Sequence, residues 1–86
     1  MNKIINNKPD LLIIGSGPVG CVIAERAAQI KKWNVLLVEK RNHIAGNCYD
    51  EKNTKGVLIH KYGPHYMRFK KKKIFNYVSK FTKWIN

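Results

Sequence analysis

The chain has 86 residues and a formal net charge of +12, from 17 basic and 5 acidic side chains. This length allows one small domain, which buries only about 60% of the surface of its unfolded chain. The two cysteines form no CxxC motif, and no apolar run approaches the roughly 18 residues of a membrane span. The sequence therefore does not indicate a disulfide scaffold or a zinc site, and a reducing cytoplasm is the expected location. Polar residues 1–9 are expected to be a disordered lead-in, and residues 10–86 to form part of one domain.

A buried strand followed by a glycine turn is the first predicted structure. Leu11–Ile14 is continuously apolar, as in parallel strands buried on both faces, and leads directly into Gly15-x-Gly17-x-x-Gly20. Gly15 lets the chain turn off the strand, Gly17 leaves the backbone open to a pyrophosphate, and Gly20 lets a helix pack closely on the sheet. A glycine turn without a ligand is the alternative interpretation.

A helix and a second strand complete the order of a βαβ dinucleotide-binding unit. Residues 21–32 have apolar side chains at helical spacing, with Glu25, Arg26 and Gln29 expected on the wetter side. Val35–Val38 is a second apolar run, and Glu39 follows it, 19 residues after the last glycine of the turn. A carboxylate there can accept hydrogen bonds from ribose hydroxyls. The predicted fold class is α/β, a Rossmann-like βαβ unit for FAD or NAD(P) with parallel strands.

Loops and one further strand are predicted in the next part of the chain. Residues 40–47 are a polar loop, and residues 50–56 are expected to be the tip of a hairpin-like excursion. Val57–His60 is a predicted third strand. Pro64 ends this run, because proline cannot continue a central strand.

The last part of the chain is predicted to be an amphipathic helix that ends a partial domain. From Lys70 to Trp84, apolar residues recur at steps of three and four. Residues 61–86 carry a net charge of +8 with no acidic residue, a field that favours anionic partners in general. Four consecutive lysines at Lys70–Lys73 oppose the helix dipole, so the first turn is expected to fray.

Two of the loop segments resemble UDP-galactopyranose mutase. They are Glu39-Lys-Arg-Asn-His-Ile-Ala-Gly-Asn47 and His60-Lys-Tyr-Gly-Pro-His65, and the resemblance extends from Asp10 to Trp84. Members of that family bind FAD and interconvert UDP-galactopyranose and UDP-galactofuranose, a precursor of cell-surface glycans. They work through an N5 adduct of the reduced flavin. The resemblance therefore implies an FAD-dependent isomerase that uses the reduced cofactor.

The resemblance covers only about the first quarter of a family member. We therefore expect this chain to be the N-terminal FAD-binding segment of a larger enzyme whose substrate domain, with the residues that bind UDP-galactose, lies downstream. The chain alone is not expected to be catalytically complete. A homo-oligomer is compatible with the full-length parent.

The resemblance also implies a set of cofactor-binding residues. Those that match the family's positions are Gly15, Gly17, Val19, Gly20, Glu39, Lys40, Arg41, Gly46, Asn47, His65 and Tyr66. The glycines and Val19 correspond to the pyrophosphate turn, and Glu39 to the ribose acid. His65 and Tyr66 correspond to a loop that lies against the flavin ring. The family's histidine there is tied to the flavin's redox state, which makes His65 the candidate catalytic residue.

Several positions depart from the family pattern. Ala45 stands where many members have glycine, and its methyl group is expected to be tolerated unless the backbone there needs a positive φ. Arg68 replaces a residue that is often histidine.

Other polar residues have plainer interpretations. The three histidines lack metal-ligand spacing, so no metal site is expected. His60 is expected to be a hydrogen-bonded strand residue and His43 a loop residue near the cofactor. Cys48 is expected to be a small neutral filler rather than a nucleophile.

Two other functions fit parts of the sequence. An amine-oxidase-like FAD-dependent oxidoreductase would share the nucleotide turn, but such enzymes do not usually carry the segment His60–His65 in this form. A basic, non-enzymatic remnant that binds polyanions would use the charge of residues 61–86. The chain has no nucleic-acid fold signature, so nucleic acid is a disfavoured partner.

Overall fold

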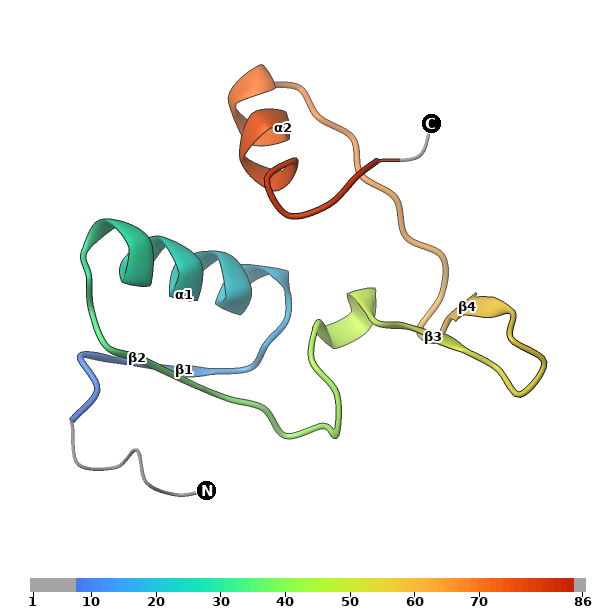
Figure 1. Cartoon of the computed structure of the whole chain (residues 1–86), viewed down its shortest axis with the longest axis horizontal. Helices are drawn as coiled ribbons and strands as arrows, with labels where there is room; N and C mark the ends of the chain where they lie inside the picture. The colour runs from blue at the N-terminus through green and yellow to red at the C-terminus, as the bar shows by residue number, and fades with distance from the viewer. Residues whose placement is uncertain (1–7, 85–86) are drawn as a thin grey trace.

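The structure is a computed structural model that describes residues 8–84, so residues 1–7 of the expected lead-in lie outside the described part. The elements, in chain order, are β1 (Leu11–Ile14), α1 (Pro18–Ile30), β2 (Val35–Val38), the 3₁₀ turn η2 (Gly46–Cys48), β3 (Asp50–Lys52), β4 (Leu58–His60) and α2 (Lys72–Val78) (Figure 1). Both predicted apolar strands thus form with the expected bounds.

β1 and β2 form a parallel pair, and α1 covers one of its faces (Figure 1). The register pairs Leu11 with Val35 and Ile14 with Val38. Beyond the strands, the Gly15 N–H donates to the Val38 carbonyl at 2.8 Å. This βαβ arrangement confirms the predicted α/β fold class, because the two strands can run parallel only with a crossover between them.

α1 begins three residues earlier than the sequence predicts and ends two residues earlier. Pro18 occupies the first turn, where its missing N–H costs nothing and its fixed φ suits a helix. The last glycine of the turn is therefore inside the helix. At the other end Lys31 is the C-cap, and Lys32 leaves the helix with a φ of +56°.

β3 and β4 form a separate antiparallel hairpin, so the expected hairpin-like excursion is present, but its tip is shorter than predicted because residues 50–52 form a strand. Asn53 shapes its tip, because its side-chain oxygen accepts from the Lys55 and Val57 N–H groups at 2.9 and 3.0 Å. The predicted third strand thus begins at Leu58 and pairs with β3, not with the parallel sheet.

α2 is shorter than the predicted helix, which was expected to reach Trp84. The helix ends at Val78, and Trp84 folds back, donating from Nε1 to the Ser79 hydroxyl at 2.9 Å. Its ring lies edge-on to Phe69, with centroids 5.4 Å apart. Aromatic packing across this return therefore replaces the last helical turns.

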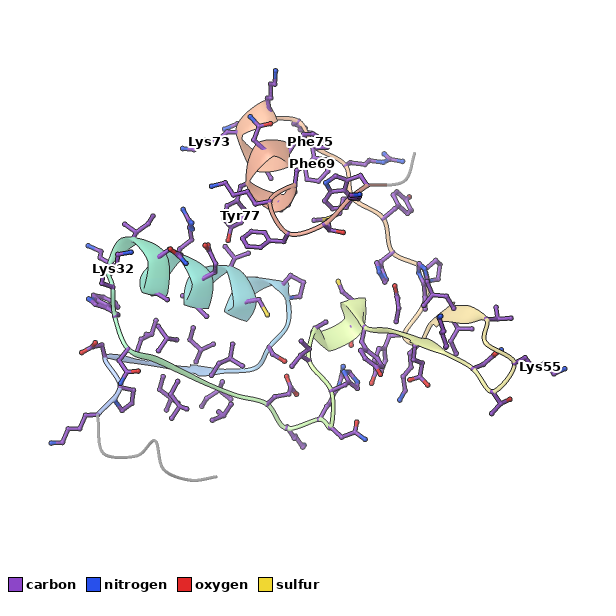
Figure 2. The ribbon with its side chains drawn as sticks, in the orientation of Figure 1. Lys32, Lys55, Phe69, Lys73, Phe75 and Tyr77 are labelled. Carbon is purple, nitrogen blue, oxygen red and sulfur yellow. The ribbon has the colours of Figure 1, made fainter. Side chains whose placement is uncertain are left out.

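One tyrosine links α2 to α1 (Figure 2). The Tyr77 hydroxyl donates to Glu25 Oε1 at 2.8 Å, and the Arg26 guanidinium lies 4.9 Å from the Tyr77 ring centroid. Of the three residues expected on the wetter side of α1, Gln29 is exposed, whereas Glu25 and Arg26 are half-buried where Tyr77 contacts them. The hydrogen bond from Arg26, followed by that from Tyr77, lowers the pKa of Glu25 to about 2.

The described residues build very little core. Ala27 is the one buried apolar side chain among residues 8–84. The radius of gyration is 15.5 Å, whereas a compact domain of this length has about 12 Å. Within the same residues, no helix is long and apolar enough to cross a membrane. Cys21 and Cys48 are both free and exposed.

Candidate functional site

Two of the three turn glycines have a structural reason to be glycine, and the third has none within the chain. Gly15 has a φ of +106°, a conformation that side chains rarely adopt. A Cβ at Gly20 would collide with the Gly15 carbonyl oxygen and press on the Ile13 side chain, so Gly20 brings α1 close to β1. Gly17 has neither reason: its φ is −72°, and a Cβ there would meet no atom within 4 Å. The chain itself therefore does not require glycine at position 17.

Gly17 is the N-cap residue of α1, and no side chain caps this end of the helix. The first backbone N–H groups of a helix have no partner within it, and the helix dipole places partial positive charge there. Val19 lies in this first turn, with its side chain exposed. Together with the free space beside Gly17, this end of α1 can accept an anionic group from outside the chain.

Glu39, at the end of β2, is held across the glycine turn by Ser16. Oε1 of Glu39 accepts from both the N–H and the hydroxyl of Ser16, at 2.9 and 2.5 Å, and Oε2 accepts from the Arg41 N–H at 2.7 Å. These bonds, led by that of the Ser16 hydroxyl, lower the pKa of Glu39 to about 2. The carboxylate is therefore ionised throughout the neutral range.

The bonds to Glu39 also limit what it can still accept. A carboxylate has about four acceptor positions. Three are used by the chain, two on Oε1 and one on Oε2. The open position is on Oε2, so Glu39 can take one further hydroxyl donor without losing a bond to Ser16.

The loop before η2 packs directly on the glycine turn. The Ala45 N–H donates to the Ser16 carbonyl at 2.9 Å, and a Cβ at Gly46 would lie 2.9 Å from the Gly17 Cα. Ala45 has a φ of +78°, which is the condition under which its methyl group was expected not to be tolerated. A left-handed alanine stores strain, of about 1 kcal/mol.

A side-chain hydrogen bond joins Arg41 to Asn47. An Arg41 guanidinium nitrogen donates to Asn47 Oδ1 at 3.0 Å, and the guanidinium lies 4.5 Å from the Tyr62 ring centroid. The Tyr62 hydroxyl is in turn 2.8 Å from Nε2 of His43, whose ring stacks on Tyr49 with centroids 3.9 Å apart. This network joins the predicted loop to the turn after β4. Lys40 is exposed beside it.

His65 and Tyr66 belong to a second cluster, next to the hairpin. The His65 ring lies 4.3 Å from the His60 ring, and its Nε2 is 3.5 Å from Asp50 Oδ1. The His65 N–H donates to Nδ1 of His60 at 3.2 Å, so His60 has the hydrogen-bonding role expected for a strand residue. Tyr66 is exposed, with Arg68 5.6 Å from its ring centroid.

The predicted residues thus form two groups. The turn glycines, Glu39 and Gly46 lie together, and the histidine group lies at the hairpin. Ser16, which is 1% exposed, was missed by the sequence analysis. A small polar residue between the first two glycines was the available signal. The proximity of Asp50 to His65 was also missed, because it depends on the pairing of β3 with β4.

Comparison with known proteins agrees with this geometry. Residues 13–81 match the family described as NAD(P)-binding Rossmann-like domain. The chain is 45% identical over 76 residues to the UDP-galactopyranose mutase of Mycoplasma genitalium, a match that covers 87% of this chain and 19% of that protein. It is 42% identical over 81 residues to the UDP-galactopyranose mutase of Mycoplasma pneumoniae, covering 93% and 20%.

A relative with a different name matches nearly as well. The dTDP-fucopyranose mutase of Escherichia coli is 40% identical over 82 residues, which covers 94% of this chain and 20% of that protein. The chain therefore spans about a fifth of the length of the curated relatives it matches. The similarity to UDP-galactopyranose mutases inferred from the loop motifs is confirmed, and by its match over residues 13–81 this chain belongs to the NAD(P)-binding Rossmann-like domain family.

Proposed function

We propose that this chain is the FAD-binding N-terminal segment of a UDP-galactopyranose mutase. The observation that carries the proposal is Gly17, which has open space at its α-carbon, an ordinary φ, and the uncapped start of α1 beside it. A glycine that the fold does not need is explained by a ligand that must approach the backbone closely. The names of the relatives supply the enzyme class.

The residues present fit the adenosine and diphosphate parts of FAD. The first N–H groups of α1 would hold the diphosphate, and the open position on Glu39 Oε2 would accept one ribose hydroxyl. Lys40 and Arg41 would lie beside the adenosine half. For Glu39 to accept hydrogen bonds from both ribose hydroxyls, the Ser16 hydroxyl would have to rotate away from Oε1. The chain itself occupies the other acceptor positions of the carboxylate.

The residues of the second cluster would serve the flavin half. His65 and Tyr66 would lie against the ring, and Gly46 and Asn47 would allow the cofactor to approach the backbone. Reduced FAD, when bound, supplies a nucleophile for the anomeric carbon of the sugar. The part of the chain's own residues in this reaction is to bind and orient the cofactor and, at His65, to hold or release a proton next to it.

We further propose that this segment binds the cofactor and does not select the sugar nucleotide. Relatives named for UDP-galactopyranose and for dTDP-fucopyranose match the chain at 45% and 40% identity over nearly the same length. Residues that select the sugar would then lie in the four-fifths of the relatives outside the match.

A chimeric enzyme tests the proposal. Residues 8–84 replace the matching segment of the Mycoplasma genitalium mutase, and the purified chimera is reduced and assayed for interconversion of UDP-galactopyranose and UDP-galactofuranose. We expect flavin to copurify and the two sugars to interconvert. A second chimera with the Escherichia coli relative should keep that relative's own substrate.

The possible failures separate the two parts of the proposal. A folded chimera that binds flavin but cannot interconvert the sugars, while the unmodified relative does, would contradict the mutase assignment and leave the cofactor assignment standing. A folded chimera without flavin would contradict both. Oxygen consumption with a non-nucleotide substrate would favour the amine-oxidase-like alternative.

A further inference from the structure

We propose that Tyr62 is a positioning residue that joins the two halves of the cofactor site, an inference that rests on the proposed function. Tyr62 lies in the turn after β4, shortly before His65. Its side chain contacts the loop of residues 40–47, which packs on the glycine turn. Tyr62 would therefore set the place of the flavin-side loop relative to the diphosphate site.

The two halves of the cofactor site belong to parts of the fold that share no sheet. Glu39 and the turn glycines lie at the end of the parallel pair, whereas His65 follows a hairpin that forms a sheet of its own. Among residues 8–84, one side-chain hydrogen bond joins residues 40–49 to residues 61–66, and it is the bond between Tyr62 and His43. The position of the flavin-side loop therefore depends on this contact.

The donor of this hydrogen bond follows from the partners of the His43 ring. Nδ1 of His43 lies 2.8 Å from the Ile44 carbonyl oxygen, which can only accept, so Nδ1 carries the proton of the neutral ring. Nε2 is then an acceptor, and the Tyr62 hydroxyl, 2.8 Å away, donates to it. Stacking on Tyr49, with ring centroids 3.9 Å apart, also holds the imidazole. The Tyr62 hydroxyl therefore meets an acceptor that is already oriented.

The ring of Tyr62 makes a second contact, with Arg41. The guanidinium lies 4.5 Å from the ring centroid, within the range of a cation–π interaction. Two hydrogen bonds fix Arg41 in turn: its guanidinium donates to Asn47 Oδ1 at 3.0 Å, and its backbone N–H donates to Glu39 Oε2 at 2.7 Å. A continuous path of contacts thus leads from Glu39, the ribose acid of the proposed site, through Arg41 to Tyr62.

The turn that carries Tyr62 is closed by hydrogen bonds to the end of β4. The Gly63 N–H donates to the His60 carbonyl at 3.1 Å, and Gly63 has a φ of +107°, which glycine adopts readily. The His65 N–H donates to Nδ1 of His60 at 3.2 Å. A short closed turn of this kind transmits the position of Tyr62 to His65.

The expected consequence is a difference between two ligands, FAD and ADP. A loop that is in place before the cofactor binds does not have to be ordered on binding, which raises affinity. Loss of the Tyr62 side chain should therefore weaken binding of FAD but not of ADP, because ADP has no flavin ring. The alternative is a tyrosine that only supports the fold, and its loss would affect both ligands alike.

Ligand binding to the flavin-free form of the Mycoplasma genitalium chimera tests the inference. The change in flavin fluorescence gives the affinity for FAD, and competition with FAD gives the affinity for ADP at the same site. Tyr62→Leu should weaken FAD binding about tenfold and ADP binding less than about twofold. Tyr62→Phe keeps the ring beside Arg41 and should lose only about threefold in FAD affinity.

A second variant tests the hydrogen bond with a milder change. His43→Phe keeps a ring stacked on Tyr49 but removes the acceptor. The double variant His43→Phe with Tyr62→Phe should lose no more FAD affinity than Tyr62→Phe alone, because the two substitutions remove the same hydrogen bond. This comparison remains informative if Tyr62→Leu fails to fold.

Trp33→Leu is the matched control, because it removes a similarly exposed ring that also lies near a cation, beyond the C-terminus of α1. It should leave both affinities unchanged. Hydrogen exchange of the flavin-free chimera gives a readout that needs no cofactor. Residues 58–66 should exchange faster in Tyr62→Leu than in the parent, and Trp33→Leu should leave their exchange unchanged.

The outcomes separate this inference from the proposed function. If the parent chimera binds FAD, equal FAD affinity in Tyr62→Leu and Trp33→Leu would overturn the role of Tyr62 alone. Equal losses of FAD and ADP affinity, additive losses in the double variant, or unchanged exchange at residues 58–66 would do the same. A folded parent chimera that binds no FAD would contradict the proposed function and this inference together.

Discussion

Ala45 has a backbone conformation that is unfavourable for a residue with a side chain. Its φ of +78° lies in the left-handed region, and the Ala45 N–H is fixed by the Ser16 carbonyl. Ala45→Gly should therefore raise the free energy of unfolding by about 0.5–1 kcal/mol, because relief of strain exceeds the entropy that glycine adds to the unfolded chain. Chemical denaturation of the chimera and its variant measures this difference.

Ala28→Gly is the control for that prediction. Ala28 is exposed on α1 with ordinary helical geometry, so glycine there should lower the free energy of unfolding by about 1 kcal/mol. If Ala45→Gly destabilised the protein as Ala28→Gly does, the left-handed geometry at Ala45 would be wrong.

Ser16 controls the ionisation of Glu39. The Ser16 hydroxyl is the largest cause of the lowered pKa of Glu39, so Ser16→Ala should raise that pKa from about 2 toward 4.5. Because the folded pKa lies below the unfolded one, Glu39 stabilises the fold above about pH 4.5, and this contribution is lost as the pH falls toward 2. In Ser16→Ala the loss should be smaller.

A carboxyl-carbon NMR titration of Glu39 measures the change. Ser79→Ala is the control, because it removes another hydroxyl, the one that accepts from Trp84, and should leave the Glu39 midpoint in place. An unchanged midpoint in Ser16→Ala would contradict the role assigned to Ser16.

Tyr77 makes the side-chain hydrogen bond that joins α2 to α1. Tyr77→Phe keeps the ring but removes the hydroxyl that donates to Glu25, so α2 should pack less firmly on α1. The pKa of Glu25, about 2, should rise, although Arg26 remains its leading partner. Since the folded pKa is lowered, the contact should persist above about pH 4.5 and weaken as the pH falls toward 2.

Hydrogen exchange of the α2 amides reports this contact. Faster exchange in Tyr77→Phe at pH 6, with α1 unaffected, is the expected result. Phe81→Leu, a change beyond α2 without a polar contact to α1, should have a smaller effect. Equal protection in Tyr77→Phe and the parent would contradict the interaction.

A helix or strand could be predicted from the sequence when the residues that cause it lie close together in the chain. The β1–turn–α1–β2 unit was predictable because four apolar residues, three glycines and one acid lie within one stretch of sequence. The helix start was misplaced by three residues, because the sequence alone does not show that Pro18 occupies the first turn of α1. The length of α2 was wrong because Trp84 packs against Phe69, a contact that helical periodicity does not reveal.

The candidate site divides in the same way. The turn glycines and Glu39 were predictable from spacing. The hydrogen bonds from Ser16, the strain at Ala45 and the Asp50–His65 contact were not, because each depends on how two loops meet. Contacts between two loops leave no periodic pattern in the sequence from which they could be predicted.

At the scale of the whole molecule, one face of the parallel pair is uncovered. α1 covers one face of the pair (Figure 1). Leu11 and Ile13 are half-buried, whereas the alternate residues of β1 are exposed, Ile14 at 81%. Leu36 on β2 shares this exposed face. Parallel sheets are normally covered on both faces, so the chain by itself is expected to be marginally stable.

The isolated chain should therefore bind a hydrophobic dye and unfold over a broad temperature range. Ile14→Thr with Leu36→Thr should reduce the fluorescence of bound anilinonaphthalene sulfonate. Ile44→Thr, at an exposed loop residue, should leave most of it. A sharp, cooperative transition without dye binding would show that the chain needs no cover on this face.

The most direct test of the central claim is the flavin affinity of the chimera with and without a side chain at Gly17. Gly17→Val places an isopropyl group where the diphosphate would approach, whereas Ala28→Val adds bulk to the same helix at an exposed position. We expect FAD, and not NADH, to bind saturably to the parent and to Ala28→Val, and Gly17→Val to lose at least a hundredfold in FAD affinity while remaining folded. Equal FAD affinity in Gly17→Val and Ala28→Val would contradict the account.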